Sequence, residues 1–245
     1  MKALSLLLFL LLQSAVATAA GNQTIESYSE AKWLLYNQVY HDHRVTLYCG
    51  AEYDQDRNVF LPEGFEIPDH YDRAYRAETE HIVAAENFGR AFLEWREGAP
   101  QCVNSRGREF KGRKCAETNI EFRLMEADLH NLAPAIGAVN AKRSNYRFGM
   151  LPNVEPTFGI CAMKIRGRIA EPPDSAKGIV ARSHLYMSDA YPTRFRLSHA
   201  QKQLFEAWDR QFPPDAWECK REQRIFIIQG NKNQFTRRQC KDKDI

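Results

Sequence analysis

Three segments of this chain repeat their hydrophobic residues with the period of an α-helix, and each predicts a helix: residues 31–40, 179–187 and 201–212. Ser27 and Ser198 precede the first and the last segment. Each is followed three residues later by Glu or Gln, which is the spacing of a helix capping box. Asp174 or Ser175 could cap the middle helix.

Shorter segments have the patterns of β-strands. Residues 119–124 alternate apolar and polar side chains, and residues 46–53 do so less regularly. Residues 224–228 (RIFII) form an apolar run typical of a buried strand. A further strand-like segment ends at Glu80 and His81. Because neighbouring side chains of a strand point to opposite faces, these two can serve one site only where the strand ends or bends.

The segment MEADLHNLAPAIGAVNAKRSN, residues 125–145, predicts a helix that carries an asparagine. Pro134 suits the first turn of a helix, so residues 133–145 should be helical. Asn140 then faces whatever element packs on this helix. Together, the expected elements predict an α+β fold that is mostly helical.

Glu80, His81 and Asn140 are the candidate residues of a compact one-metal site. A carboxylate and an amide offer hard oxygen ligands suited to Mg²⁺ or Ca²⁺. An imidazole titrates near neutral pH and can accept a proton from water. Each residue alone has an ordinary alternative: a surface carboxylate for Glu80, a structural histidine for His81, and a packing or helix-terminating residue for Asn140.

The first 19 residues have the pattern of a secretory signal peptide. Lys2 precedes an apolar run over residues 4–12, and Ala17-Thr18-Ala19 fits a small-residue cleavage site. The run is too short for a permanent membrane anchor, which is the alternative interpretation. We therefore expect cleavage near Ala19 and an exported, soluble chain without membrane association.

Six cysteines follow the predicted signal peptide: Cys49, Cys102, Cys115, Cys161, Cys219 and Cys240. An even number in an exported chain predicts three disulfides, and the sequence leaves 15 connectivities open. The favoured pairing has two short loops, Cys102–Cys115 and Cys219–Cys240, with Cys49–Cys161 joining the two halves. No CxxC pair is present, which argues against a zinc ribbon or a thioredoxin-like redox site.

Size and composition favour a single globular domain. About 225 residues remain after the signal peptide, and they can bury a substantial core. No internal repeat, low-complexity tract or linker divides them, so we expect one domain over residues 20–245, present as a monomer. The net charge of +3 becomes +2 when Lys2 is removed (3 − 1), which by itself does not indicate a nucleic-acid partner.

Charge is nevertheless distributed unevenly. Residues 51–80 carry nine acidic side chains against three basic ones. Residues 104–114, flanked by Cys102 and Cys115, carry Glu109 against five basic side chains: Arg106, Arg108, Lys111, Arg113 and Lys114. This loop is a candidate phosphate-binding surface, and a solvated surface loop is the alternative. A second basic cluster is expected to be a surface tail: Lys232, Arg237, Arg238, Lys241 and Lys243.

The chain resembles the bacterial endonuclease I family, which consists of exported nucleases of the His-Me finger (ββα-metal) type. Six segments carry the resemblance in the family's order: EHIVAAENFG (80–89), KGRKC (111–115), MEADLHNLAPAIGAVNAKRSN (125–145), FGICAMKI (158–165), AEPPDSAKGIVARSHLYM (170–187) and AWECKREQRIFIIQGN (216–231). They cover most of the mature chain, and the EADLHNL-PAIG-VN signature is long and specific. The resemblance implies a single nuclease domain built around a ββα-metal motif.

The resemblance also implies roles for five residues. His81 matches the general base that deprotonates water, while Glu80 and Asn140 match the protein ligands of one divalent ion. That ion is expected to be Mg²⁺, with Mn²⁺ or Ca²⁺ as other occupants. Arg113 matches the arginine that stabilises the phosphate, with pairing to residues 51–80 as its alternative. Glu126 matches a general acid or positioning group, with helix capping or a salt bridge as its alternative.

Other polar residues are expected to be structural. His130 and Asn131 lie within the signature and are predicted to be scaffold. His41 and His43 are predicted to be surface residues, because no third metal ligand with suitable spacing follows them. The chain departs from the family pattern at five positions, none of them an expected ligand: Ala84, Ala138, Ala141, Lys142 and Lys232.

The expected activity is that of a non-sequence-specific, metal-dependent endonuclease in the periplasm or the medium. It should cut double- and single-stranded DNA, with RNA as a further candidate substrate, and leave 5′-phosphates. Phosphate contacts bind without reading base sequence. The acidic stretch 51–80 should lie away from the groove, apart from Glu80.

Two alternatives belong to other functional classes. One is a secreted nucleic-acid-binding protein that uses the same scaffold without catalysis. The other is a different exported hydrolase, such as a protease or an esterase. The sequence contains neither HExxH nor GxSxG, which argues against the second alternative.

Overall fold

The computed structural model describes residues 20–240. The predicted signal peptide, its cleavage near Ala19 and residues 241–245 therefore lie outside the described residues. Within the described part, no helix has the length and apolar character that a membrane crossing requires. The assignment of residues 20–245 to one domain stays a prediction.

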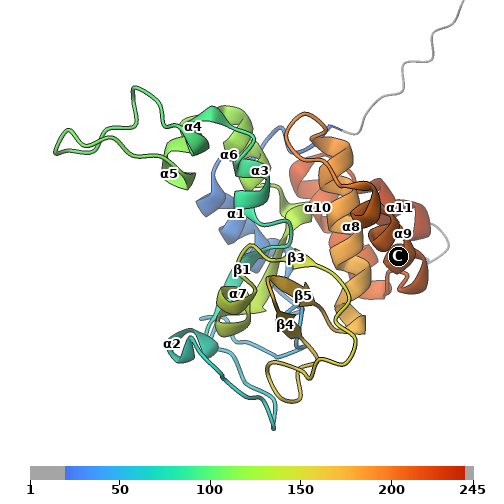
Figure 1. Cartoon of the computed structure of the whole chain (residues 1–245). Coiled ribbons are helices and arrows are strands. Elements are labelled where there is room, and N and C mark those ends of the chain that lie inside the picture. The colour runs from blue at the N-terminus through green and yellow to red at the C-terminus, as the bar shows by residue number, and fades with distance from the viewer. Residues whose placement is uncertain (1–19, 241–245) are drawn as a thin grey trace, which may run out of the picture.

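Helices dominate the described chain, and the strands form two small sheets (Figure 1). The elements up to β2 are, in order, α1 (Tyr28–Leu34), the π-helical η1 (Leu35–Val39), α2 (Tyr71–Ala74), β1 (Ala77–His81), α3 (Ala85–Gly89), α4 (Leu93–Arg96), α5 (Arg113–Ala116), α6 (Ile120–Glu126), the 3₁₀-helical η2 (Leu129–Asn131) and β2 (Leu132–Ile136). The later elements are α7 (Gly137–Arg143), β3 (Arg147–Phe148), β4 (Lys164–Arg166), β5 (Ile169–Glu171), α8 (Asp174–Ala190), α9 (His199–Gln211), α10 (Ala216–Gln229) and α11 (Gln234–Cys240). This mixture agrees with the predicted α+β class.

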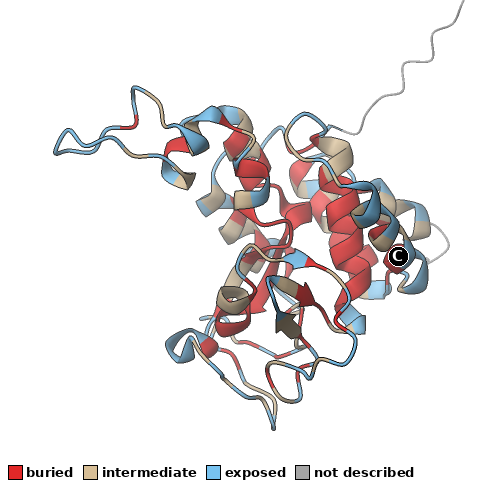
Figure 2. Ribbon diagram, viewed as in Figure 1, coloured by how far each residue is buried: buried red, intermediate tan, exposed pale blue. Residues whose placement is uncertain are grey.

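The core is organised around α8, which is buried from Ala176 to Met187 (Figure 2). One apolar cluster joins α8 and α9 to β1, β2 and α7. A second lies between α8, α3 and α6, and a third joins α1 and η1 to α10. Because β1, β2 and α7 all pack into the first cluster, their polar side chains are positioned by the same part of the core.

The helices that were predicted from capping and period are present. Residues 31–40 fall in α1 and η1, and Ser27 accepts a hydrogen bond from the Glu30 amide. Residues 201–212 fall almost wholly in α9, whose N-terminus has the full capping box of Ser198 and Gln201. Residues 179–187 lie in α8, which starts at Asp174 without a side-chain cap.

Several strand predictions are wrong. Residues 119–124 belong to α6, because the Asn119 side chain accepts hydrogen bonds from the Glu121 and Phe122 amides and starts a helix. Residues 224–228 lie inside α10, where Asp215 caps a longer helix. Residues 46–53 form no strand and contribute only isolated bridges.

The predicted helix over residues 133–145 starts later than expected. Pro134 lies in β2 opposite Thr79, and the helix α7 begins at Gly137. Proline is tolerated in β2 because a two-stranded sheet consists of edge strands. The first third of the predicted helix therefore completes a strand pair instead.

Three disulfides are present, Cys49–Cys161, Cys102–Cys115 and Cys219–Cys240, and they agree with the pairing favoured from the sequence. The last one attaches α11 to α10, so the described part of the expected basic tail is a packed helix. Arg238 of α11 forms an ion pair with Asp209 at 2.6 Å.

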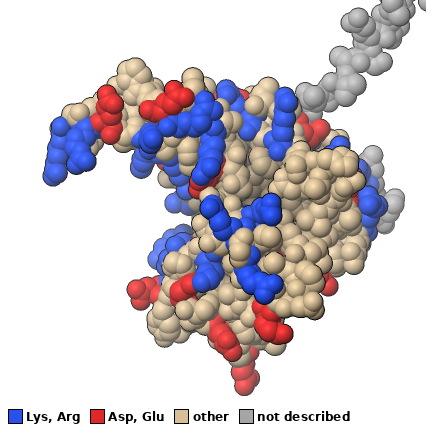
Figure 3. Space-filling view, viewed as in Figure 1, with Lys and Arg blue, Asp and Glu red and all other residues tan. Residues whose placement is uncertain are grey.

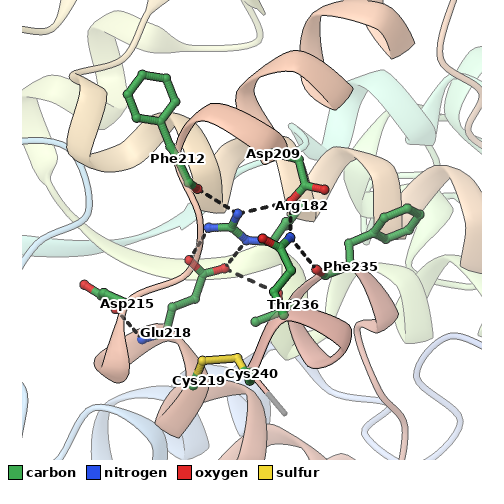
Figure 4. Close-up of a disulfide and its surroundings, with 10 residues drawn as sticks. Arg182, Asp209, Phe212, Asp215, Glu218, Cys219, Phe235, Thr236 and Cys240 are labelled. Atoms are coloured by element: carbon green, nitrogen blue, oxygen red, sulfur yellow. Dashed lines mark hydrogen bonds and ion pairs between the residues drawn. A yellow bond between two sulfur atoms is a disulfide. The ribbon is translucent and has the colours of Figure 1, made fainter. Parts of the chain in front are cut away.

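A buried arginine, Arg182 of α8, connects helices near this disulfide (Figure 4). Arg182 of α8 donates to Glu218 of α10 at 2.6 Å, to Asp209 of α9 at 3.1 Å and to the Phe212 carbonyl at 2.9 Å. Thr236 of α11 donates to the same Glu218 carboxylate at 3.3 Å. The guanidinium thereby provides hydrogen-bond donors to two carboxylates and one backbone carbonyl near the ends of α9 and α10, and it fixes how these helices pack on α8.

Candidate active site

The predicted site residues lie on an antiparallel strand pair and the helix that follows it. β1 pairs with β2, with Glu80 opposite Ala133 and His81 opposite Leu132. β1 ends at His81, as the sequence predicted. α7 follows β2 directly and carries Asn140.

A close contact fixes the start of α7. A side chain at Gly137 would clash with the Arg73 carbonyl oxygen and with the Glu78 carboxylate. Glycine at this position therefore lets α7 lie directly against the chain that leads into β1. The approach brings Asn140 within hydrogen-bonding distance of Glu78.

Glu80 is buried and has one free carboxylate oxygen. Its Oε1 accepts a hydrogen bond from the Tyr48 hydroxyl at 2.6 Å and lies 3.3 Å from Nε of the buried Arg143. Its Oε2 makes no hydrogen bond with the residues that the structure describes. Burial raises the pKa of Glu80, and the positive charge of Arg143 partly opposes that rise. The carboxylate thus has a fixed orientation and one oxygen that is available to a cation.

His81 is buried as a neutral imidazole. Its Nε2 lies 2.9 Å from the Glu126 carbonyl oxygen, which can only accept, so we assign the ring proton to Nε2. Burial lowers the pKa of His81 to about 3, and the positive charge of Arg113 adds to the effect. Nδ1 therefore carries an unprotonated lone pair and has no protein hydrogen-bond partner among residues 20–240.

Arg113 and the buried Glu126 form a partly buried ion pair beside this ring. Arg113 Nε donates to Glu126 Oε1, and its guanidinium lies 4.8 Å from the Tyr28 ring centroid. The Tyr28 ring in turn lies 5.0 Å from the His81 ring. Burial raises the pKa of Glu126, and the charge of Arg113 opposes the rise. Arg113 Nη2 is buried without a partner in the described chain, so one donor remains for an anionic group.

Asn140 is oriented by a carboxylate that the sequence analysis did not single out. Its Nδ2 donates to Glu78 Oε2 at 2.9 Å, which leaves the amide oxygen Oδ1 without a partner among residues 20–240. Glu78 also binds the Arg73 guanidinium, with Nε at 2.8 Å from Oε1. The amide oxygen of Asn140 is therefore the atom available to a cation.

These side chains line one open cavity of about 520 Å³. Its wall includes Glu80, His81, Arg113 and Asn140. Five further basic side chains line it: Lys32, Arg57, Arg73, Arg76 and Arg143. Residues 97–116, which are the chain between α4 and α5 together with α5, form a projecting arm (Figure 1). Figure 3 shows a hollow between this arm and the part of the molecule that carries α2 and α7, with Lys and Arg gathered on both sides. The cavity suits a polyanion.

The acidic stretch 51–80 lies partly away from the cavity. Of its nine carboxylates, Glu78 and Glu80 line the wall, whereas all three of its basic residues do so: Arg57, Arg73 and Arg76. The expectation that only Glu80 reaches the site is wrong, because Glu78 binds Asn140. The stretch nevertheless contributes more positive than negative side chains to this cavity.

The other four basic side chains of residues 104–114 lie apart from Arg113, outside the cavity. Arg106, Arg108, Lys111 and Lys114 are exposed on the arm and do not line the cavity. Lys114 pairs with Glu117 at 3.3 Å. Their contact with phosphate stays a prediction, and it would concern phosphates further along a bound strand.

The remaining polar residues named from the sequence have structural contacts. Asn131 exchanges hydrogen bonds with the backbone of Val83, at 2.7 Å and 3.0 Å, and so fixes the chain two residues after His81. His130 is buried beside Glu222 at 3.3 Å. His43 stacks on Trp217, with ring centroids 3.8 Å apart. Lys142, one of the departures from the family pattern, pairs with Asp69.

Sequence reasoning missed three residues that hold the site together: Tyr48, Glu78 and Arg143. Arg143 also donates to the carbonyls of His81 and Ile82, so it binds both the Glu80 side chain and the backbone around it. Its position one helical turn after Asn140 is the signal that could have identified it. Tyr48 and Glu78 lie in segments without a recognisable pattern.

The available donors fit a hard divalent cation better than zinc. The described residues contain no cluster of three or more His, Cys, Asp or Glu side chains that could hold a metal. Glu80 and Asn140 together offer two free oxygens. Mg²⁺ commonly binds through one or two protein oxygens and completes its shell with water and substrate phosphate, whereas zinc sites take three or four protein ligands.

Comparison with known proteins finds a matching family model and relatives that are named as endonucleases or deoxyribonucleases. The model of the endonuclease I family matches residues 22–240. An extracellular deoxyribonuclease of Aeromonas hydrophila is 41% identical over 212 residues, which are 83% of this chain and 86% of that protein. A periplasmic deoxyribonuclease of the same species is 37% identical over 241 residues, 96% and 95% of the two chains. Endonuclease-1 of Buchnera aphidicola subsp. Acyrthosiphon pisum is 36% identical over 224 residues, 89% and 83% of the two chains.

Proposed function

The chain belongs to the endonuclease I family and is a nuclease, and we propose that it is a metal-dependent endonuclease that hydrolyses DNA without sequence specificity and leaves 5′-phosphates. The observation that carries this proposal is the free Nδ1 of a neutral, buried His81 beside the free oxygens of Glu80 and Asn140. The β1–β2–α7 unit would be the ββα-metal motif of the His-Me finger type. RNA is a further candidate substrate.

His81 would act as the general base. Its Nε2–H donates to the Glu126 carbonyl, so Nδ1 can take the proton from the attacking water. Because the His81 ring is already neutral, it does not have to lose a proton before it accepts one from water. Water then attacks phosphorus, the bond to the 3′-oxygen breaks, and that oxygen takes up a proton from solvent to become a hydroxyl, which leaves the phosphate on the 5′-oxygen.

Glu80 and Asn140 would hold the divalent cation, with Mg²⁺ as the expected ion and Mn²⁺ or Ca²⁺ as other occupants. When bound, the cation would supply positive charge to the phosphate and the leaving 3′-oxygen. Tyr48 and Arg143 fix the Glu80 carboxylate, and Glu78 fixes the Asn140 amide. The chain therefore presents two oriented oxygens.

Arg113 would bind the phosphate through its unpaired Nη2, with Glu126 holding the guanidinium in place. Since Glu126 is buried and paired with Arg113, a positioning role suits it better than that of a proton donor. The basic cavity wall would bind neighbouring phosphates without reading bases. Such contacts suit a nuclease of low specificity.

Export of the chain is part of the same proposal. Relatives bear the names extracellular and periplasmic deoxyribonuclease, and the first 19 residues have the pattern of a signal peptide. The three disulfides suit an oxidising compartment. We expect a monomer in the periplasm or the medium.

The test is cleavage of supercoiled plasmid in Mg²⁺ by the wild type and by His81→Ala, with a parallel DNA-binding assay. We expect the wild type to cut, EDTA to stop it, and His81→Ala to bind DNA while cutting at least about a hundredfold more slowly, as for loss of a general base. His199→Ala, which alters an exposed histidine on α9, is the matched control and should cut like the wild type.

Either of two results would overturn the proposal. Equal cutting by His81→Ala and the wild type would remove the general-base role. No cutting by the wild type in Mg²⁺, Mn²⁺ or Ca²⁺, with DNA binding intact, would favour the non-catalytic binding protein. Parallel assays on single-stranded DNA and RNA would define the substrate range.

A further inference from the structure

A second cavity adjoins the candidate active site. It has a volume of about 780 Å³ and lies between the helix α1–η1 on one side and the turn around residues 53–57 on the other. Lys32 and Arg57 line both cavities, so the two spaces meet at these side chains. No role in the proposed reaction uses this second space.

The wall of the second cavity combines positive charge with an exposed aromatic ring. Trp33 is 57% exposed, although it is among the largest apolar side chains. Lys32, Arg44 and Arg57 surround the space, and Asp54 is the acidic member of the wall. Asp54 already accepts two hydrogen bonds from Asn58, each of 2.8 Å. Basic groups around an exposed ring are the composition of a single-strand binding surface.

The backbone holds Arg57 at the junction in a costly conformation. Arg57 has a φ of +68°, which is uncommon for a residue other than glycine. Its guanidinium lies 5.2 Å from the Tyr36 ring centroid, on the wall of the second cavity. Backbone strain of this kind persists where the surrounding structure requires the side chain in one place.

A buried hydroxyl on the same wall lacks a partner. Tyr53 is 4% exposed, and its OH makes no hydrogen bond within the described chain. Buried hydroxyls are usually bonded, so an unpaired one on a cavity wall indicates a missing polar ligand or water. A sugar or phosphate oxygen could accept from it.

The spacing along α1 relates the ring to the reacting phosphate. Tyr28 contacts His81, and Trp33 follows five residues later on the same helix. Five residues of helix rise about 7.5 Å along the axis and turn the side chain by about 140°, so Trp33 lies on another face of α1 than Tyr28, at the second cavity. One strand of DNA carries a phosphate about every 3.4 Å along the helix axis, so the axial rise alone corresponds to roughly two nucleotides, and the turn around the helix adds to the separation.

We propose that the second cavity is a subsite for an unpaired nucleotide of the same DNA strand, two to three nucleotides from the cut phosphate. A base stacks on Trp33, while Lys32, Arg44 and Arg57 bind the phosphates that lead to it. Bases inside a duplex already have both faces covered, so this subsite selects single-stranded or frayed DNA. The inference rests on the proposed function, because it takes the cut phosphate to lie beside His81.

The test measures affinity as a function of strand length. Labelled single-stranded thymidine oligonucleotides of about two to about twelve nucleotides are titrated in Mg²⁺ against His81→Ala, in which the strand should stay intact, and against the same protein carrying Trp33→Ala. We expect Trp33→Ala to weaken binding roughly 5- to 100-fold for the longer strands, which is the range for loss of one stacked base. Dinucleotides, which end before the ring, should bind both proteins equally.

Three further variants complete the test. Phe60→Ala removes an aromatic ring that is 60% exposed and lines neither cavity, so it should follow the parent at every length. Trp33→Tyr should restore most of the affinity, since another aromatic face is present. Quenching of tryptophan fluorescence by the longer strands should fall in Trp33→Phe.

The outcomes separate this inference from the proposed function. Equal affinities of Trp33→Ala and its parent at all lengths would overturn the subsite while wild-type cleavage of plasmid continued. A loss of the same size for dinucleotides and long strands would also overturn it, because that result indicates general damage to the site. Failure of the wild type to cut DNA would instead overturn the proposed function.

Discussion

Glu80, His81 and Asn140 share one property at the residue scale. Each has one polar atom bound by a neighbour and a second atom without a partner in the described chain. The neighbours are a hydroxyl, a backbone carbonyl and a carboxylate, so the orientation of each side chain is decided before any ligand arrives. Residues that contact a metal ligand or a catalytic group from behind contribute in this way, because they hold it in the orientation that binding or catalysis requires.

Glu78→Ala tests this property. Loss of the Glu78 carboxylate frees the Asn140 amide to rotate, so its oxygen no longer has a fixed direction. We expect the affinity for Mg²⁺ or Mn²⁺ to fall about 10- to 100-fold, as is typical when an outer partner of a metal ligand is removed. Calorimetric titration with Mn²⁺ and the Mg²⁺ dependence of plasmid cleavage would measure it.

Glu63→Ala is the matched control, because Glu63 is an exposed carboxylate of the same acidic stretch and does not line the cavity. It should bind the metal like the wild type. Unchanged metal affinity in Glu78→Ala would mean that Asn140 is oriented by something else, or is not a ligand.

At the scale of elements, the sequence predicted helices where local signals agree with tertiary contacts. Ser27 and Ser198 start helices whose apolar faces are also buried, so propensity and packing act together. Residues 119–124 alternate like a strand, yet the Asn119 cap and the cluster beneath α6 favour a helix. Residues 224–228 are apolar on several faces, and only the length of α10 decides between strand and helix.

α8 shows what burial does to an ionisable side chain within an element. His184 lies among the rings of Phe148, Phe195 and Phe205, and burial lowers the pKa of His184 to about 3. In the unfolded chain a histidine titrates near about 6.5. Between these two values the unfolded state binds a proton that the folded state does not.

The folded state should therefore lose stability as the pH falls below about 6.5, by about 1.4 kcal/mol per pH unit from His184. This contribution is fully present above pH 6.5 and is lost progressively toward pH 3. In His184→Gln the slope of the free energy of unfolding against pH should be smaller by about 1.4 kcal/mol per pH unit, which corresponds to one proton. Urea denaturation at several pH values between about 4.5 and 7.5 would measure the slope.

The matched control for this experiment is His199→Gln, which makes the same change at an exposed position on α9. Its pH slope should stay close to that of the wild type. If His184→Gln and the wild type had the same slope, protonation of His184 would not contribute to acid unfolding.

At the scale of the whole molecule, the sequence predicted residues that the fold places on one cavity, Glu80, His81, Arg113 and Asn140, and their roles stay predictions. The candidate residues are spread over 60 positions of the chain, from Glu80 to Asn140, and their family pattern links them without any knowledge of the packing between them. The contacts that position them could not be predicted in this way. Tyr48 and Arg143 reach Glu80 only because residues 48, 80 and 143 are brought together by the folded core.

The disulfides also join separate parts of the chain, over very different sequence distances. Cys49–Cys161 joins residues 112 positions apart, whereas Cys102–Cys115 spans 13. Cys49 also follows Tyr48, whose hydroxyl binds Glu80. Loss of the long-range bond should therefore affect both stability and the site.

Cys49→Ser with Cys161→Ser should lower the free energy of unfolding by about 4–5 kcal/mol, and Cys102→Ser with Cys115→Ser by about 3 kcal/mol, because a longer loop costs more entropy to close. Urea denaturation would measure both.

Strong reductant should reduce DNA cleavage by the wild type. The reduced state would then keep a newly made chain inactive before export. Full activity in strong reductant would show that the disulfides do not control the enzyme.

The projecting arm would have a consequence for a chain that is exported to the periplasm or the medium. Arg106 and Arg108 lie exposed near its tip, where a trypsin-like protease could cut the chain. Both lie between Cys102 and Cys115, so the two pieces would remain covalently joined after such a cut. A nicked enzyme would then keep both pieces and migrate as one species on a non-reducing gel, whereas a reducing gel would separate the pieces.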